Sequence, residues 1–413
     1  MEENMKKFLA LLLMIPLLLG MTVPPAHAKP LIDASAAVMV DASTGQVIYE
    51  QNAQKKLPIA SISKLLTAVV IEDEVHSKQI TGDTKVKIDS GVADISNDPQ
   101  YLAIGLQEGN AYTVRELLNA SLVKSADGAA LALSAAAGDS LDEFDMKLQQ
   151  KARDIGLKNY TIVNPVGLTN GDLKSLASKQ YADNAENAMT ATDVAILARY
   201  LVNHYPQLLQ VTAQKQATFM ISKGKTKTEK NLNEMLPGGK YTVPGVTIDG
   251  LKTGTSDKAG ACFVSTGNYR GHRIITVVLH ANGQNKDNRF VQTQRLYQML
   301  KQSDRLQTIT LPKNIRQQPL ADGQTRQATL SPKQITVWNA GGHIHKYTLA
   351  VKMKKQYLNK QGQLVAPLRR NQTLGDLDLS SSQVKTLDGG PLTYRLTSTD
   401  NVARGNFWQR LWH

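Results

Sequence analysis

Apolar residues in the longer, N-terminal part of the chain follow both the two-residue period of strands and the 3.6-residue period of helices. Strands are predicted at Ala36–Asp41, Gln46–Glu50, Val246–Leu251, Gly260–Tyr269 and His272–Leu279. Helices are predicted at Ser61–Ile71, over most of Val114–Ala137, and at Leu141–Ile155, Thr190–His204 and Asn288–Lys301. Turn residues Asp41-Ala-Ser-Thr-Gly45 join the first two strands, which predicts a hairpin. Strands at both ends with helices between them predict an α+β fold, with a mainly antiparallel sheet carrying a helical subdomain.

The pattern changes after residue 305, where short alternating runs replace the long apolar segments. Thr348–Lys354 and Gly375–Leu379 alternate, and Gly-containing turns such as Asp322-Gly323 and Asp388-Gly-Gly390 separate such runs. Short strands with turn signals between them are typical of an all-β domain. We therefore divide the chain into a larger α+β domain at 29–305 and a small all-β domain at 306–400.

The first 28 residues have the pattern of a secretory signal peptide. An apolar run, Phe8–Met21, follows Lys6 and Lys7 and precedes Ala26-His-Ala28, a small-x-small cleavage pattern. The run has 14 residues, whereas a membrane-spanning helix needs about 20. An uncleaved anchor is the alternative that the cleavage pattern disfavours, so we expect an exported protein whose translation starts at Met1 or Met5.

The last residues, 401–413, form a segment rich in aromatic residues. If the segment is helical from about Val402, its large apolar side chains share one face: Phe407, Trp408, Leu411 and Trp412. Aromatic residues flanked by arginine suit a membrane interface. The sequence therefore predicts an amphipathic membrane-anchoring tail, and the alternative is a terminal helix packed on its own domain.

The net charge indicates which partners the protein can bind, and the cysteine content limits its chemistry. The 413-residue chain is 41% hydrophobic with a net charge of +13, and residues from 306 onward hold 15 Lys and Arg against 5 Asp and Glu. Such an excess of positive charge attracts an anionic membrane surface or acidic polymers. Because the chain is expected to be exported and has no recognisable binding motif, we expect no nucleic acid. Cys262 is the single cysteine, so no intrachain disulfide forms, and its strand-like surroundings indicate a buried hydrophobe.

A nucleophile is indicated by one of several Ser-x-x-Lys strings. The string occurs at four places, Ser61/Lys64, Ser121/Lys124, Ser222/Lys225 and Ser382/Lys385. Ser61 opens an apolar helix, so Lys64 lies one turn further along the same face. Burial there lowers the pKa of Lys64 and lets it take the Ser61 proton, while the helix start offers free N–H groups to an oxyanion. By contrast, Ser222/Lys225 falls in a predicted solvated basic loop and Ser382/Lys385 in the β domain.

A second string, Lys252-Thr-Gly254, occurs once, within the predicted strand Ile248–Thr255. Glycine in a strand lets another backbone approach closely, and a strand edge can bind an extended peptide by main-chain pairing. Lys252 then offers a positive charge to a substrate carboxylate. Taken alone, the string would favour an ordinary glycine-containing strand with a surface lysine.

Several short strings occur together and in order, and this set resembles one family. The strings are Asp41-Ala-Ser-Thr-Gly45, Pro58-Ile-Ala-Ser-Ile-Ser-Lys64, Ser125-Ala-Asp127, Asn164-Pro-Val-Gly-Leu168 and Asp249-Gly-Leu-Lys-Thr-Gly254 with Ala259-Gly260. They resemble the serine D-alanyl-D-alanine carboxypeptidases, the low-molecular-weight penicillin-binding proteins. Ala366-Pro-Leu368 with Gly375 resembles that family's β-rich C-terminal domain, so the likeness covers nearly the whole chain. It implies a β-lactamase/transpeptidase-like catalytic domain and no metal or cofactor.

The resemblance also implies roles for individual residues. Ser61 would be the acylated nucleophile, Lys64 its general base, and Ser125 a group that helps pass a proton to the leaving D-alanine. The substrate-binding positions implied are Asp127, Lys252, Thr253, Gly254 and Thr255. Lys252 and Thr253 would bind the terminal carboxylate, and the N–H groups of Ser61 and Thr255 would form the oxyanion hole.

Two positions depart from the family pattern. Asp127 stands where Asn is usual, and an ionised Asp cannot donate a hydrogen bond to a substrate carbonyl. Its carboxylate would favour the ammonium form of Lys64, and it could pair with either Lys64 or Lys124. Val166 stands where a histidine is frequent. We expect activity to survive with altered β-lactam sensitivity.

The leading hypothesis is an exported serine D,D-carboxypeptidase that removes the terminal D-alanine of peptidoglycan stem pentapeptides and is acylated by penicillins. It would act at the outer face of the cytoplasmic membrane and in the cell wall. A serine β-lactamase is an alternative, although no convincing Glu-x-x-Leu-Asn segment supplies its usual base. A non-catalytic peptidoglycan-binding relative is the other alternative, suggested only by Asp127.

Overall fold

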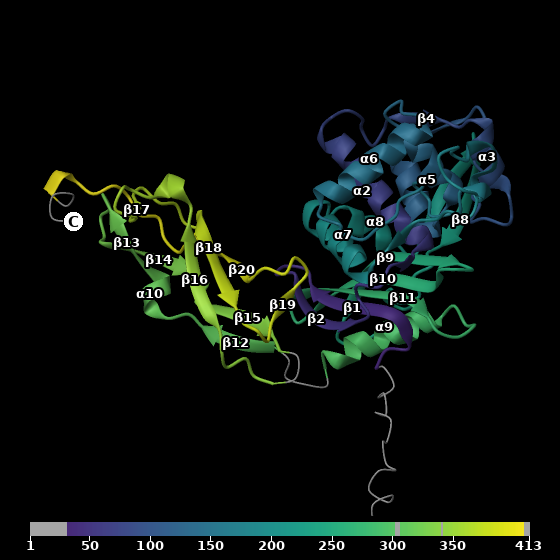
Figure 1. Cartoon of the computed structure of the whole chain (residues 1–413). Coiled ribbons are helices and arrows are strands. Elements are labelled where there is room, and N and C mark those ends of the chain that lie inside the picture. The colour runs from purple at the N-terminus through teal and green to yellow at the C-terminus, as the bar shows by residue number, and fades with distance from the viewer. Residues whose placement is uncertain (1–30, 302–305, 340–341, 409–413) are drawn as a thin grey trace, which may run out of the picture. The chain divides into compact units, whose positions relative to one another are not determined.

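The structure, a computed structural model, describes residues 31–301, 306–339 and 342–408 (Figure 1). The predicted signal peptide, residues 1–28, lies outside the described residues, as do Leu411 and Trp412 of the predicted tail.

A six-stranded antiparallel sheet forms the centre of the N-terminal part. Its strand order is β19-β2-β1-β11-β10-β9. The strands are β1 Ala34–Asp41, β2 Gln46–Gln51, β9 Thr247–Ser256, β10 Gly260–Tyr269, β11 His272–Ala281 and β19 Lys385–Thr386. The predicted hairpin of β1 and β2 is confirmed, and so are the strands at both ends of this region. Because side chains alternate across a strand, Val38 and Val40 enter one apolar core while Ala37 and Met39 enter another.

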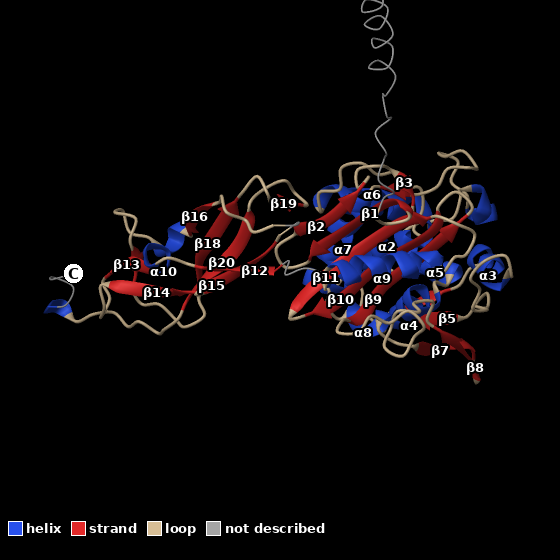
Figure 2. Cartoon of the chain, turned by 90° about the horizontal axis from the view of Figure 1, so that it is seen from below, coloured by secondary structure: helices blue, strands red, loops and turns tan. Residues whose placement is uncertain are grey.

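Helices cover both faces of this sheet (Figures 1 and 2). The longer ones are α2 Lys64–His76, α6 Leu141–Asp154, α7 Ala191–His204 and α9 Asn288–Met299, and the shorter ones are α3 Ser90–Asn97, α4 Val114–Asn119, α5 Asp127–Ser134 and α8 Leu208–Thr212. Helix α9 packs on one face, and α7 packs on the other with the helical subdomain beyond it. Side-chain hydrogen bonds cap the N-termini of several helices. At α6, for example, Ser140 and Glu143 form a capping box. The predicted α+β class is therefore confirmed.

Short two-stranded ladders connect the helices. They pair β3 Leu57–Pro58 with β6 Ala188–Met189, β4 Lys85–Lys87 with β5 Ala111–Thr113, and β7 Gln216–Ser222 with β8 Lys225–Lys230. The stretch around Ser222/Lys225, predicted to be a solvated basic loop, is solvent-exposed as predicted, but it forms the turn end of the β7–β8 hairpin and not an irregular loop. Alternate residues Ala217 and Phe219 are buried, and this apolar face holds the hairpin against the protein although β8 is rich in lysine.

The predicted helical stretch from Val114 is mostly helical but contains a sharp break. A π-helical turn, Ala120–Lys124, follows α4, and Ser125 then adopts a left-handed conformation with φ of 64° before α5 begins at Asp127. A residue other than glycine with positive φ is uncommon and cannot continue a right-handed helix. The break is structurally important because it separates Ser125 from the helix that carries Asp127.

The C-terminal region is all-β, as predicted. One sheet has the order β16-β18-β20-β14-β13-β17 and a second pairs β12 with β15. These strands are β12 Leu306–Thr310, β13 Gln317–Ala321, β14 Gln327–Ser331, β15 Gln334–Trp338, β16 Thr348–Met353, β17 Leu364–Val365, β18 Thr373–Ser380 and β20 Leu392–Ser398; a short helix, α10 Lys313–Arg316, lies between β12 and β13. A separate apolar core of mainly leucine and isoleucine fills this region.

The end of the described chain differs from the predicted tail. Val402 pairs with Leu368 through two backbone hydrogen bonds of 2.9 Å, and Arg404 forms a bridge with Gly323. The prediction of a helix from about Val402 is therefore wrong for this stretch, because the backbone pairs with the β region instead. Phe407 and Trp408 lie beyond it and remain 61% and 69% exposed. Within the described residues, no helix is both long enough and apolar enough to cross a bilayer.

Asp145 on α6 provides a test of stability against pH. Its carboxyl group is buried without a hydrogen-bond partner among the described residues, and burial, together with Asp142, raises its pKa to about 8. The folded state therefore holds this proton while the unfolded chain loses it near pH 4, so stability falls as pH rises from about 4 to about 8. We expect the stability of the Asp145→Asn variant to lose this dependence on pH. Its free energy of unfolding relative to the parent should therefore rise by a few kcal/mol from pH 5 to pH 8. Urea unfolding at both pH values measures the difference, and an equal gain at both would contradict the prediction.

Candidate active site

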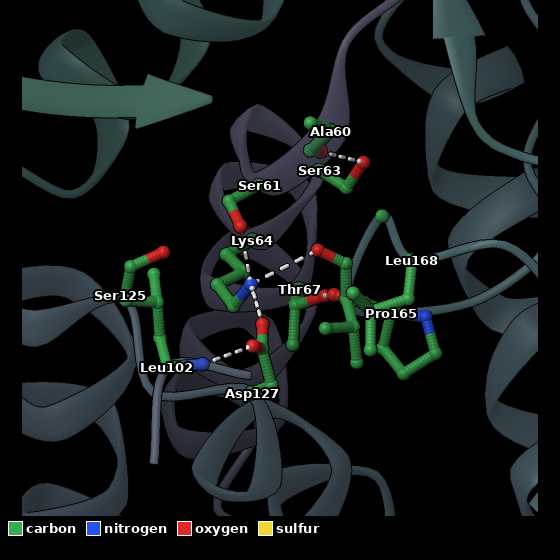
Figure 3. A network of polar contacts seen from close by, with 12 residues as sticks. Ala60, Ser61, Ser63, Lys64, Thr67, Leu102, Ser125, Asp127, Pro165 and Leu168 are labelled. Atoms are coloured by element: carbon green, nitrogen blue, oxygen red, sulfur yellow. Dashed lines mark hydrogen bonds and ion pairs between the residues drawn. The ribbon is translucent and has the colours of Figure 1, made fainter. Parts of the chain in front are cut away.

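Ser61 lies in a single 3₁₀ turn, η1 Ala60–Ser63, that leads directly into α2. Lys64 Nζ lies 2.8 Å from Ser61 Oγ, as the Ser-x-x-Lys spacing predicts. The same Nζ lies 2.8 Å from Asp127 Oδ1 and 3.0 Å from the carbonyl oxygen of Val166 (Figure 3). Lys64 is completely buried. This burial lowers the pKa of Lys64, whereas the charge and hydrogen bond of Asp127 act to raise it.

A loop after Asn164 supplies the carbonyl oxygen that faces Lys64. Asn164 Oδ1 accepts hydrogen bonds from the N–H groups of Val166 and Gly167, at 3.1 and 2.7 Å. Gly167 has φ of 86°, and a Cβ there would lie 2.0 Å from the Ala60 carbonyl oxygen. The asparagine and the glycine of the Asn164–Leu168 string thus hold this loop against the turn that carries Ser61. Val166, at the position of the family's frequent histidine, contributes its backbone to the site.

Asp127 joins two elements of the site with its two oxygens. Oδ1 pairs with Lys64, and Oδ2 accepts a hydrogen bond of 3.0 Å from the Leu102 N–H (Figure 3). Of the two lysines that the sequence offered as partners, Lys124 pairs instead with Glu229 at 2.7 Å. Asp127 is therefore a buried ion-pair partner of Lys64.

Ser125 and Lys252 form a second serine–lysine pair. Lys252 Nζ lies 2.7 Å from Ser125 Oγ and 3.1 Å from the Thr253 carbonyl oxygen. Burial, together with the nearby charges of Lys64 and Arg289, holds the pKa of Lys252 well below its ordinary value. The site therefore contains two buried lysines, each in contact with a different serine.

Strand β9 brings Lys252 beside the turn that carries Ser61. A Cβ at Gly254 would lie 2.5 Å from the Ile59 carbonyl oxygen, so only glycine permits this approach. A cavity of about 790 Å³ lies beside the strand, and Ser61, Ser125, Thr253 and Thr255 are among its lining residues. All the predicted site residues therefore lie together, with Lys64, Asp127 and Lys252 packed behind those that line the cavity.

Arg289 is a site residue that the sequence analysis missed. Its Nη1 donates to Thr255 Oγ1 at 2.8 Å and to the Gly254 carbonyl oxygen at 3.1 Å, and the residue lines the cavity. Burial lowers the pKa of Arg289 from its usual value, although a guanidinium keeps its proton throughout the physiological range. No local motif marks Arg289. It lies in the first turn of α9, and only the folding of the chain brings this turn beside β9.

Two segments that the sequence analysis did not assign to the site also line the cavity. One is the segment 99–102, which includes Leu102, the backbone partner of Asp127. The other is the end of β8, where Thr228, Glu229 and Lys230 face the cavity. Both segments, one a loop and the other a strand end, bring polar and charged groups to the wall of the cavity.

The family of the chain follows from comparison with known sequences. Residues 24–283 match the family described as D-alanyl-D-alanine carboxypeptidase, Peptidase_S11. The chain belongs to this family. The Peptidase_S11 match contains the Ser61, Asp127 and Lys252 strings, and it confirms the resemblance stated from the sequence.

Related proteins match beyond the region of the Peptidase_S11 profile. The chain is 27% identical to D-alanyl-D-alanine carboxypeptidase DacF of Bacillus subtilis, over 91% of this chain and 90% of the relative. It is 26% identical to DacC of Escherichia coli, over 93% of this chain and 88% of that relative. A crystal structure of a peptidoglycan synthesis regulatory factor (PBP3) from Streptococcus pneumoniae is 30% identical, covers 90% of this chain and 99% of its own, and has a TM-score of 0.77. The predicted transpeptidase-like fold with an all-β C-terminal region is thereby confirmed, and the chain is a serine peptidase of the S11 family.

Proposed function

We propose that the protein is an exported serine D,D-carboxypeptidase that removes the terminal D-alanine from peptidoglycan stem pentapeptides through an acyl-enzyme on Ser61. The observation that supports this most strongly is the pairing of each serine with a buried lysine, Ser61 with Lys64 and Ser125 with Lys252, beside one cavity. Penicillins would acylate the same Ser61.

Strand β9 would hold the end of the peptide by main-chain pairing along its free edge. The terminal carboxylate would lie against Lys252, Thr253 and Thr255, with the charge of Arg289 directly behind Thr255. Ser61 Oγ attacks the carbonyl of the last peptide bond while its proton passes to a lysine amine, and the proton then goes to the departing D-alanine nitrogen. Water hydrolyses the ester on Ser61. In this proposal Gly254 lets β9 lie directly against the turn that carries Ser61, and the N–H groups of Ser61 and Thr255 receive the oxyanion.

The activity is tested with purified protein lacking residues 1–28. We expect release of D-alanine from a diacylated Lys-D-Ala-D-Ala peptide and covalent labelling by a fluorescent penicillin. Labelling without D-alanine release would favour a binding relative, and rapid turnover of penicillin would favour a β-lactamase. Absence of both would contradict every acyl-enzyme mechanism for this chain.

We extend the proposal to location and to domain organisation. The stem peptide is a component of the cell wall, so the family's activity supports an extracytoplasmic site. We propose a catalytic domain at 29–305, a basic all-β domain at 306–400, and a tail at 401–413 that contacts the outer face of the cytoplasmic membrane. Acidic wall polymers are further candidate partners of the basic domain, whose charge would favour them.

Exposed aromatic residues at the end of the described chain test the membrane contact. Replacing both Phe407 and Trp408 with serine removes the apolar groups that would enter the interface while leaving the Val402 pairing intact. Because each buried methylene contributes about 0.8 kcal/mol, we expect binding to anionic liposomes to weaken at least about tenfold. Co-sedimentation measures it, with the exposed Tyr347→Ser change as a control for general surface effects. Unchanged binding of the double variant would contradict a membrane role for the tail.

A further inference from the structure

The two buried lysines of the site differ in their counter-charges. Lys64 contacts the Asp127 carboxylate, a carbonyl oxygen and Ser61. Lys252 contacts a hydroxyl and a carbonyl oxygen, and in the described part of the chain no carboxylate lies within ion-pair distance of it. Arg289 adds a positive charge near Lys252. Two buried ammonium groups beside one carboxylate are unfavourable, since a buried charge needs a partner.

The charged and polar groups around Lys64 and Lys252 decide which of the two lysines is protonated. The groups facing Lys64 are Ser61 from its own turn, Asp127 from α5 and the Val166 carbonyl from the loop after Asn164. The groups facing Lys252 are Ser125 and the backbone of its own strand. The charges of Lys64, Asp127 and Arg289 act on Lys252 from further away, and of these only Asp127 favours its ammonium form. At the rim, Lys124 is neutralised by Glu229. Asp127 thus contacts Lys64 directly but lies beyond ion-pair distance of Lys252, and an asparagine at this position would remove that preference.

We propose that Asp127 keeps Lys64 in the ammonium form, so that Lys252 is the neutral lysine of the free enzyme and receives the Ser61 proton through Ser125. This inference rests on the proposed function and reverses the role that the family resemblance implies for Lys64. Lys64 then becomes a positioning residue with a fixed charge, which donates to Ser61 Oγ and favours the developing negative charge on it.

Binding of the substrate would make Lys252 a stronger base. A terminal carboxylate bound at Lys252 supplies the counter-charge that the site lacks, which favours the ammonium form of Lys252. The lysine therefore becomes a stronger base when a substrate is in place, and the permanent charge of Arg289 attracts the carboxylate beforehand. Penicillin also carries a carboxylate and would act in the same way.

The proton transfers balance without any added reagent. The Ser61 proton moves to Ser125 Oγ as the Ser125 proton moves to Lys252 Nζ, while the Ser61 Oγ–carbonyl carbon bond forms. The same proton returns through Ser125 to the D-alanine nitrogen as the peptide C–N bond breaks. Hydrolysis repeats the transfer, with water in place of Ser61 as the nucleophile and Ser61 Oγ as the leaving group.

Lysine side-chain NMR on the unliganded protein tests the protonation states directly. In protein labelled with ¹³C and ¹⁵N at lysine, we expect one neutral amine signal at pH 7. That signal should be absent from the Lys252→Arg variant and present in the Lys64→Arg variant. Loss of the signal in Lys64→Arg instead, two neutral signals, or no neutral signal would each overturn the inference. This experiment needs no activity, so it separates the inference from the proposed function.

Acylation kinetics supply a second test, because arginine keeps a positive charge but cannot accept a proton at neutral pH. We expect Lys252→Arg to slow penicillin acylation by at least about 100-fold, as for loss of a general base. Lys64→Arg keeps the ion pair with Asp127 and should be less damaging. The opposite ranking would overturn the inference, whereas a parent protein that neither labels nor releases D-alanine would instead remove the proposed function.

Discussion

Replacing Ser61 with alanine is expected to abolish both D-alanine release and penicillin labelling. Ser61 Oγ is the hydroxyl that contacts Lys64 and lines the cavity beside β9, so no other group in the proposal can form the acyl-enzyme. Removing a catalytic nucleophile lowers turnover by about 10⁴-fold or more. Mass spectrometry of the penicillin adduct and a coupled D-alanine assay measure the two losses.

A neighbouring serine gives the matched control. Ser63 lies in the same turn, but its hydroxyl donates to the Ala60 carbonyl oxygen at 2.7 Å and is not among the cavity-lining groups. We expect Ser63→Ala to lose about 1 kcal/mol of stability and to keep its penicillin adduct. An adduct that persists in Ser61→Ala, or that maps to another residue, would show that Ser61 is not the nucleophile.

Replacing Gly167 with alanine is expected to have the largest effect on stability. The left-handed φ of 86° alone costs about 1–2 kcal/mol for a residue with a Cβ. The new methyl group would also meet the Ala60 backbone at 2.0 Å, and backbone atoms on two packed segments cannot both move away without loss of contacts. We expect a total loss of at least about 3 kcal/mol, together with slower acylation because the Val166 carbonyl oxygen would move from Lys64.

Gly156→Ala separates the two causes of this loss. Gly156 has φ of 84°, and nothing lies within 4 Å of the position of its Cβ, so this change carries the backbone strain without the collision. Chemical denaturation of both variants gives the difference, and penicillin acylation rates report on the site. Equal destabilisation of the two variants would contradict the prediction, because it would mean that the methyl group at position 167 fits beside Ala60 without cost.

Much of the fold could be predicted because its strands and helices are long and strongly periodic. Gly260–Tyr269 was predicted with the bounds that β10 has, and Leu141–Ile155 differs from α6 by one residue. The Ser61 and Lys64 contact was also predictable, because a helix fixes the distance between residues three apart. The burial of Cys262 was predictable too, because its neighbours in the sequence form an apolar strand.

Other features depend on contacts between distant segments and therefore left no local pattern. The break at Ser125 is invisible in an Ala- and Leu-rich stretch, since the left-handed turn is stabilised by the surrounding structure. Arg289 resembles any other polar residue at the start of a helix. Val402 was expected to be helical from the spacing of aromatic residues, yet its backbone pairs with Leu368, which the sequence could not indicate.

The order of the central sheet has a consequence for the behaviour of the protein in solution. Strand β9 lies at one edge beside the cavity, while β2 at the other edge is covered by β19, through the pairs Lys385↔Val47 and Thr386↔Gln46. An uncovered strand edge is a template for self-association. A fragment ending at Lys301 would expose β2 and so would present two such edges instead of one. The C-terminal region thus leaves the central sheet with one uncovered edge, that of β9, where the substrate is proposed to bind, and we expect its removal to favour aggregation.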